Sequence, residues 1–269
     1  MTVEPYPFTQ LSWKGLKIKR RWQPIREKLN YAGFFAEYEM VRRGHRQCDI
    51  YQLDADQFDW QLKKVMDDGL VIQPILRSRK YSGFGHQHYC TDIIDSDTFI
   101  FSVVARTLED AQTFREANLG DIDHKVIGQM LGYPECCIDW FLEAWLKDGC
   151  IDPLFEAAAN TEDAVRDGDT VTVSGHPWFN RFIRYFGFSV IPYFTHSLKC
   201  DESMKFAETF HELMHEHSPE AVEALDEALA MPVTWSLHNL IIEVDHPLFR
   251  GAANGYYWPR KLTVEWTPE

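Results

Sequence analysis

The sequence contains few cysteines and no long apolar run. Six cysteines among 269 residues are too few to form a disulfide framework for a protein of this size. No stretch approaches the roughly 20 apolar residues that a membrane-spanning helix needs. The first residues, MTVEPYPFTQLSWKG, lack the zones of a signal peptide. We therefore expect a cytoplasmic protein with reduced thiols that does not contact a membrane.

Positive charge is also scarce. The chain has 27 lysines and arginines against 41 aspartates and glutamates, a formal net charge of −14. Such a balance disfavours nucleic-acid binding, which needs a clustered positive field. One basic stretch, KGLKIKRRWQPIREK at residues 14–28, could contact an anion or RNA. A solvated helix face is the simpler interpretation. Composition predicts no oligomeric state.

The residue pattern predicts a mixture of helices and short strands without a repeat. Hydrophobic residues make up 45% of the chain, enough to bury a sizeable core. Periodicity and cap signals predict helices at residues 22–44, 57–70, 108–118, 125–131, 135–148, 176–187, 200–217 and 219–230. Apolar and β-branched runs predict strands at residues 71–78, 98–105, 188–194 and 261–266.

No strict alternation of strand and helix follows from this order. The expected class is α+β, a helix-rich single domain with a small mixed or antiparallel sheet. We expect an N-terminal helix and strand region at 1–121 and a cysteine-motif region at 122–269, joined as one continuous globular unit. The acidic stretch 159–175 is the best candidate for an internal boundary or an exposed loop.

Two adjacent cysteines, Cys136 and Cys137, lie in LGYPECCIDWF at the expected start of a helix. Pro134 at the first helical position, followed by Glu135, is a favourable helix opening. The positive end of the helix dipole favours the thiolate, the form that attacks electrophiles and binds metals. The simpler interpretation is that both cysteines are small core residues, since the rest of the helix is largely apolar.

A second segment strengthens the functional interpretation. FTHSLKCDES places His196 and Cys200 four residues apart at another helix opening. Together with Cys136 and Cys137 they would supply three sulfurs and one nitrogen, a suitable set for zinc or an iron–sulfur cluster. Adjacent cysteines are unusual for structural zinc, in which two to four residues commonly separate a pair.

These segments resemble an uncharacterised family of archaeal and bacterial proteins that contain a domain of unknown function. The resemblance covers roughly residues 100–260 and rests on four segments, namely IGQMLGYPECCIDWF, NRFIRYFG, HSLKC and PVTWSLHNLIIEVDHPLFR. It implies a Cys-Ser-x-x-Cys pattern where this chain has His196 and Cys200. Histidine keeps the ability to bind metal but cannot form a dithiol pair, so the resemblance favours a metal site. It implies no reaction.

A literal H-E-x-x-H motif occurs at His211, Glu212 and His215. On a helix this spacing puts two imidazoles on one face for zinc, with the glutamate as base. Glu243 or His246 could supply a third ligand. The apolar face of the helix, however, points away from both histidines. We therefore expect His211 and His215 to face solvent, and the zinc-hydrolase interpretation ranks below the cysteine site.

Two further groups are candidates for substrate binding. GFGHQHYCTD carries His86, His88, Cys90 and Asp92 at alternate positions, which in extended chain would line one side of a pocket. The second group consists of Asn180, Arg181 and Arg184. Two arginines three residues apart on a helix could hold a carboxylate or phosphate. A polar surface loop and structural ion pairs are the respective alternatives.

Four functions remain open at this point. The first is an enzyme that acts on a small molecule with zinc or an iron–sulfur cluster held by Cys136, Cys137, His196 and Cys200. The second is a thiol enzyme in which Cys136 or Cys137 is the nucleophile. The zinc hydrolase built on His211 is the third. The fourth is a non-catalytic protein with structural cysteines.

Overall fold

A computed structural model describes residues 9–54, 57–79, 89–90, 98–147, 153–238, 241–254 and 260–267. Among them, residues from Glu37 to Ile138 form one compact unit, here called unit 2, and those before and after form unit 1. Helices α1 and α5 each continue across a division between the units. The division into a region 1–121 and a region 122–269 that form one continuous globular unit stays a prediction.

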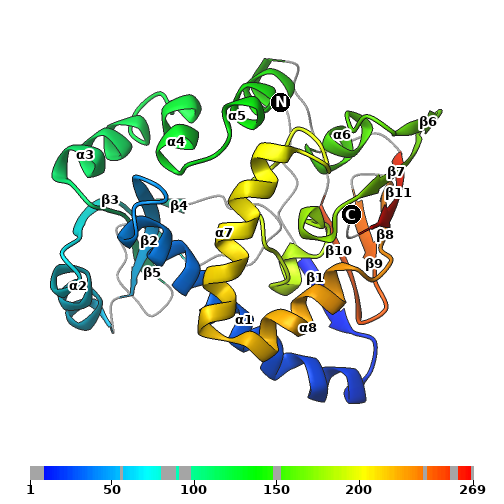
Figure 1. Ribbon diagram of the computed structural model, residues 1–269, viewed down its shortest axis with the longest axis horizontal. Coiled ribbons are helices and arrows are strands. Elements are labelled where there is room, and N and C mark those ends of the chain that lie inside the picture. Colours follow the sequence, from blue (N-terminus) through cyan, green and yellow to red (C-terminus); the bar gives the residue numbers. More distant parts are fainter. Residues whose placement is uncertain are drawn as a thin grey trace. The chain divides into compact units, whose positions relative to one another are not determined.

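The α+β class is confirmed (Figure 1). The α-helices of the described residues are α1 (Leu16–Arg42), α2 (Phe58–Asp67), α3 (Leu108–Ala117), α4 (His124–Met130), α5 (Glu135–Phe141), α6 (Pro153–Ala159), α7 (Asp201–His217) and α8 (Pro219–Leu229). A π-helical turn, η1 (Leu142–Lys147), follows α5, and two 3-10 helices are η2 (Pro177–Phe179) and η3 (Arg184–Phe186). Within the described ranges, no helix has the length and apolar character needed to cross a membrane.

Unit 2 contains an antiparallel sheet in the order β2-β5-β3-β4. Its strands are β2 (Cys48–Asp54), β3 (Val71–Arg79), β4 (Tyr89–Cys90) and β5 (Thr98–Ala105). Side chains on one face of β5, among them Phe101 and Val103, pack with Phe114 of α3 and Met130 of α4. On the other face, Val104 packs with residues of α1 and α2. Because both faces of β5 are covered, its sequence is almost continuously apolar.

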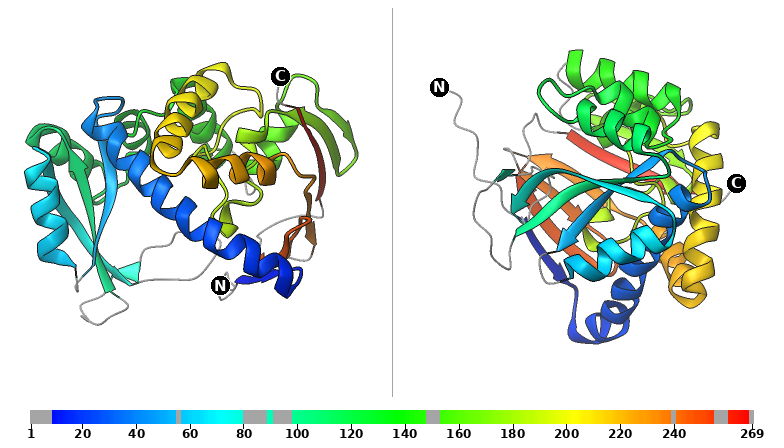
Figure 2. Two further views of the ribbon diagram at one scale, coloured as in Figure 1. Left: turned by 60° about the horizontal axis from the view of Figure 1, so that its bottom comes forward. Right: turned by 90° about the vertical axis from the view of Figure 1, so that its left-hand side faces the viewer.

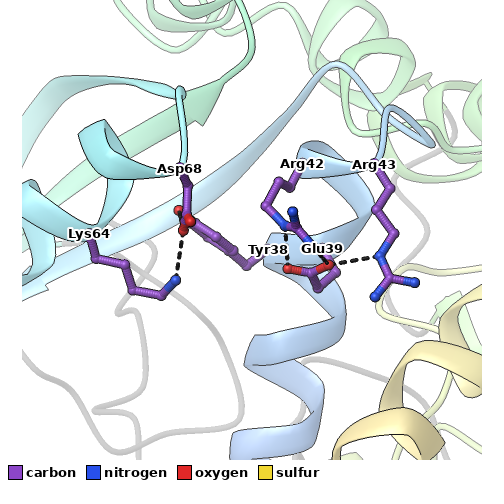
Figure 3. Close-up of polar contacts among 6 residues, drawn as sticks. All are labelled: Tyr38, Glu39, Arg42, Arg43, Lys64 and Asp68. Carbon is purple, nitrogen blue, oxygen red and sulfur yellow. Dashed lines mark hydrogen bonds and ion pairs between the residues drawn. The ribbon is translucent and has the colours of Figure 1, made fainter.

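Polar contacts join the C-terminal end of α1 to α2 (Figure 3). The Tyr38 hydroxyl donates to Asp68 at 2.7 Å, and Lys64 pairs with the same carboxylate at 2.7 Å. These two hydrogen bonds hold the pKa of Asp68 below its usual range. The next residue, Glu39, accepts hydrogen bonds from Arg42 and Arg43, which lie one turn further along the chain. Figure 2 shows α1 as one continuous helix, although Pro24 lies inside it.

Unit 1 contains a mixed sheet in the order β1-β10-β9-β8-β11-β7-β6. The strands are β1 (Thr9–Trp13), β6 (Val165–Asp167), β7 (Thr170–Gly175), β8 (Thr234–His238), β9 (Ile241–Asp245), β10 (Phe249–Asn254) and β11 (Arg260–Trp266). All pairs are antiparallel except β11 and β7, which run parallel. Residues from both ends of the sequence therefore lie in one sheet.

Three expectations for unit 1 were wrong. Residues 188–194 form no strand but a buried irregular segment, in which Pro192 has no N–H to donate to a sheet. Residues 176–187 form only η2 and η3, because the backbone leaves helical geometry at Asn180, whose ψ is 83° and whose buried amide donates to the Leu229 carbonyl. The acidic stretch 159–175 is not a loop. It contains the hairpin β6–β7, which turns at Gly168.

A buried histidine closes the turn between β9 and β10. The side chain of His246 contacts the Ala228 carbonyl through Nε2 at 3.1 Å, and its Nδ1 accepts from the Leu248 amide at 3.2 Å. Its ring stacks on Phe249 at 4.4 Å between centroids. Burial lowers the pKa of His246 to about 4 from 6.5. The neutral imidazole is therefore the form that the fold holds.

The His246 imidazole should make unit 1 sensitive to acid. The pKa of His246 is lower in the folded than in the unfolded chain. Its contribution to the free energy of unfolding is therefore complete above pH 6.5 and is lost progressively as the pH falls toward 4. The loss should be on the order of 3 kcal/mol. Chemical unfolding between pH 7 and 4 should show a shallower pH dependence for His246→Gln than for the wild type. His215→Gln, at an exposed position, is the control and should leave the slope unchanged.

The hydroxyl of Tyr38 should stabilise unit 2 by a measurable amount. Tyr38→Phe removes the donor to Asp68 while keeping the buried ring, so the free energy of unfolding should fall by about 1 kcal/mol. Tyr31→Phe on the same helix, where the side chain is 70% exposed, is the matched control and should change nothing. Equal stability of the two variants in urea unfolding would contradict this role for the Tyr38 hydrogen bond.

Candidate metal centre

Cys136 and Cys137 occupy the first turn of α5. The Pro134 carbonyl accepts the amides of Cys137 and Ile138 at 2.9 and 3.0 Å, and the helix begins at Glu135, the first residue of the expected range. Successive helical residues point about 100° apart. Cys136 is accordingly exposed, whereas the residue Cys137 is only 2% exposed. Both thiols lie where the amide dipoles of a helix start favour negative charge.

Cys200 is the N-cap residue of α7. Its sulfur accepts the Ser203 amide at 3.4 Å, and the residue is 4% exposed. Asp201 and Glu202 follow in the first turn, where acidic side chains complement the helix dipole. The expected helix opening at this cysteine is confirmed.

Side chains from the end of α6 position the segment from His196 to Cys200. The Asn160 amide donates to the His196 carbonyl at 2.9 Å. The Thr161 hydroxyl accepts the Leu198 amide at 2.9 Å while donating to the Ala157 carbonyl at 2.9 Å. These bonds satisfy backbone groups that no regular element would satisfy. They fix the chain on both sides of Ser197.

A glycine allows the same segment to lie close to β7. A Cβ at Gly175 would stand 2.9 Å from the Leu198 Cβ and 3.3 Å from the Trp266 ring. Real side chains do not approach at 2.9 Å, so any other residue would displace Leu198. The position of Leu198 is therefore constrained by backbone approach as well as by hydrogen bonds.

The four residues expected to form a metal site lie together. The ligand atoms of Cys136, Cys137, His196 and Cys200 are all within 4.8 Å of one another. His196 is partly buried, and Cys136 is the most accessible member. Three sulfurs and an imidazole nitrogen at this spacing form a compact group that could bind a metal ion. It is the one such group of three or more metal-binding residues within the described ranges.

The H-E-x-x-H residues are arranged differently. His215 is exposed as expected, but His211 is not, since its side chain is only 15% exposed. The His211 ring stacks on Trp178 at 4.4 Å. Its Nε2 lies 3.0 Å from Asp226, which also accepts the Trp178 indole N–H at 2.9 Å. η2 and α8 thus cover a side of α7 that its own periodicity assigns to solvent.

The two downstream residues considered as a third ligand for that motif are His246 and Glu243. The first already makes hydrogen bonds to backbone groups through both ring nitrogens, and the second is exposed. Near His211, burial lowers the pKa of His176, as does the neighbouring His211. The cluster of Trp178, His211 and Asp226 links three helical elements.

The arginine group has contacts of its own. The guanidinium groups of Arg181 and Arg184 lie over the Phe194 ring at 4.9 and 5.3 Å from its centre. Asn180 is fully buried, and its amide donates to the Leu229 carbonyl at 2.8 Å. Substrate binding by Asn180, Arg181 and Arg184 stays a prediction.

The histidine loop lies largely outside the described residues. His86, His88 and Asp92 are not among them, and of Cys90 only the backbone pairing of β4 is described. Substrate contacts by His86 and His88 also stay a prediction. Among the other cysteines, Cys48 is fully buried in the core of unit 2, and burial raises its pKa strongly.

Asn160 and Thr161 were not singled out from the sequence. They lie in AAANTEDA, where the acidic composition suggested a connection rather than a structural role. A local signal existed, because Asn and Thr at the end of a helix often bond to nearby backbone groups. Their partner, thirty-six or more positions along the chain, gave no such signal.

No protein-family model, curated protein or solved structure matches this chain. The resemblance to a domain of unknown function, based on the LGYPECC and HSLKC segments, therefore stays a prediction. Support for the candidate metal centre comes from the geometry of its four residues alone.

Thr161 should be needed for the shape of the segment from His196 to Cys200. Thr161→Val keeps the volume but leaves the buried Leu198 amide without its acceptor, at a cost of about 1–3 kcal/mol. Urea unfolding should show this loss, and zinc affinity should fall with it. Thr161→Ser retains the hydroxyl and should stay near the wild type in both measurements. Full zinc affinity in Thr161→Val would show that the hydrogen bond does not position the ligands.

Proposed function

We propose that this protein binds one zinc ion through Cys136, Cys137, His196 and Cys200, and that the ion stabilises the starts of α5 and α7. The observation that carries the proposal is the spacing of the four ligand atoms, all within 4.8 Å. Ligands about 2.3 Å from a tetrahedral ion stand roughly 3.8 Å apart. Contraction by about 1 Å or less would complete the site.

The spacing favours a single ion over an iron–sulfur cluster. In a cluster, protein ligands bind different iron atoms, and their bonds point outward from a body of iron and sulfide. Ligand atoms on opposite sides are then separated by that body. A spread of at most 4.8 Å is too small to enclose it, whereas it suits one ion at the centre.

The donor set favours zinc and a structural role. Thiolates with one imidazole suit zinc better than hard cations such as magnesium or calcium. Structural zinc sites have four protein ligands, whereas catalytic sites keep one position for water or substrate. With four candidate ligands present, stabilisation of the fold is the function that the geometry supports best. A reaction on a small molecule stays a prediction.

A thiol enzyme without metal is the second candidate. It is favoured by one observation, the exposure of Cys136 in the first turn of a helix. A nucleophilic cysteine needs access to substrate and a neighbour that stabilises the thiolate. The two candidates differ in whether the purified chain takes up zinc with defined stoichiometry.

The wild-type chain should bind one zinc ion, and Cys200→Ser should weaken binding at least about a hundredfold by replacing a thiolate with a poor ligand. Serine is itself a favoured N-cap residue, so the start of α7 keeps its cap and the substitution tests the ligand alone. Competition with a chromophoric chelator measures the affinity. Cobalt substitution should give thiolate charge-transfer absorption that decreases in the variant.

Two histidine variants complete the test. His211→Ala and His215→Ala should each retain one zinc per chain, although His211→Ala should lose stability because it removes the contacts to Trp178 and Asp226. Zinc loss in these variants, with retention in Cys200→Ser, would support the hydrolase motif instead. Failure of the wild type to bind zinc would sink the proposed function.

A further inference from the structure

The ligands of the proposed zinc site differ sharply in accessibility. The residues Cys137 and Cys200 are 2% and 4% exposed, whereas Cys136 is exposed and His196 is partly buried. A dissolved reagent therefore reaches the sulfur of Cys136 first. Among thiols, reaction with oxidants and electrophiles follows access and thiolate character, and a zinc ligand is held as thiolate.

Two buried thiols lie close enough to react with an oxidised Cys136. The first, Cys137, is adjacent in a helix, and its Cα is about 3.8 Å away. A disulfide needs a Cα separation of about 4.4–6.8 Å, so the helix would have to distort for this pair to join. Cys200 lies on a different element, with its sulfur within 4.8 Å. The restriction on adjacent residues does not apply to Cys200, which is therefore the partner that we expect.

We propose that Cys136 makes the centre responsive to hydroperoxides, with a disulfide between Cys136 and Cys200 that expels the zinc ion. This rests on the proposed function. The Cys136 sulfur attacks a peroxide oxygen, so that an S–O bond forms and the O–O bond breaks. With hydrogen peroxide this gives a sulfenic acid and, after protonation, water.

The second step closes the disulfide. The Cys200 thiolate attacks the Cys136 sulfur, an S–S bond forms, and the sulfenic oxygen leaves as hydroxide that is protonated to water. In sum, two thiols and one hydrogen peroxide give one disulfide and two waters, with one electron lost by each sulfur. Zinc loses two of its four ligands, and Cys137 with His196 cannot hold it. A thiol reductant reverses the change.

The test starts from the zinc-loaded full-length chain. Hydrogen peroxide should release one zinc per chain, measured with a chromophoric chelator, and peptide mapping should find Cys136 joined to Cys200. Dithiothreitol should restore zinc binding. Cys48, fully buried, is the internal control and should remain reduced in the same digest.

A pair of ligand exchanges separates the role of Cys136 from that of the site. Cys136→His gives a two-cysteine, two-histidine set, and His196→Cys gives a four-cysteine set, both of which suit zinc. Peroxide should release zinc from Cys136→His at least about tenfold more slowly, because its remaining thiols are buried. His196→Cys should respond like the wild type. Equal release rates for Cys136→His and wild type would overturn the proposal.

A measurement on the wild type does not depend on the variants. Dimedone traps sulfenic acids, and a brief peroxide pulse in its presence should label Cys136 before any other cysteine. First labelling at Cys137 or Cys200, or a disulfide between those two, would overturn the proposal even if Cys136→His does not fold. Zinc binding by the wild type that peroxide leaves intact would also overturn it while leaving the proposed function in place.

Discussion

The segment from His196 to Cys200 depends on one buried hydroxyl. The Thr161 hydroxyl donates to the last turn of α6 and accepts from the Leu198 amide. These hydrogen bonds attach the irregular chain between His196 and Cys200 to the end of α6. Asn160 adds a second bond to the same segment. An irregular segment has no ladder of its own to satisfy its amides and carbonyls. Without these two side chains, the His196 carbonyl and the Leu198 amide would lose these hydrogen bonds.

Helix starts supply the other half of the arrangement. At α5 and α7 the backbone leaves amides without intrahelical acceptors, and cysteine sulfurs stand beside them. At α7 the sulfur of Cys200 accepts one of those amides. The same feature favours thiolate and limits the directions in which the side chain can point. Helix capping and the proposed metal ligation thus place compatible demands on Cys200.

Much of the fold could be predicted from local sequence. The helices from α1 to α5, with α7 and α8, follow from apolar periodicity and caps, and β3, β5 and β11 follow from β-branched runs. Residues 188–194 misled because a buried irregular segment is as apolar as a buried strand. Strands β8, β9 and β10 were missed, although TWSLH and IIEVD alternate weakly. The two-residue turn of β6–β7, Gly168-Asp169, was overlooked because the surrounding stretch is acidic, although Gly-Asp between two strands indicates a hairpin.

The four-residue site could be predicted because each of two short motifs places metal-binding side chains at the start of a helix. Its supporting contacts could not, since Thr161 and Leu198 are 37 positions apart. The burial of His211 likewise depends on Trp178 and Asp226, which come from other elements. Periodicity describes the face that a helix turns to its own core. It does not report what later segments place on the opposite side.

The mixed sheet of unit 1 also sets the order in which the chain can fold during synthesis. Thr9 in β1 pairs with Ala253 in β10, and β7 pairs with β11 across a shorter interval, with Thr170 opposite Lys261. Unit 2 is encoded between the first and last parts of unit 1, and its strands need no residue beyond Ile138. Unit 2 can therefore form before β10, the partner of β1, has been synthesised. β1 then stays unpaired until β10 has been synthesised, and this long-range pairing is the slow step that the topology imposes.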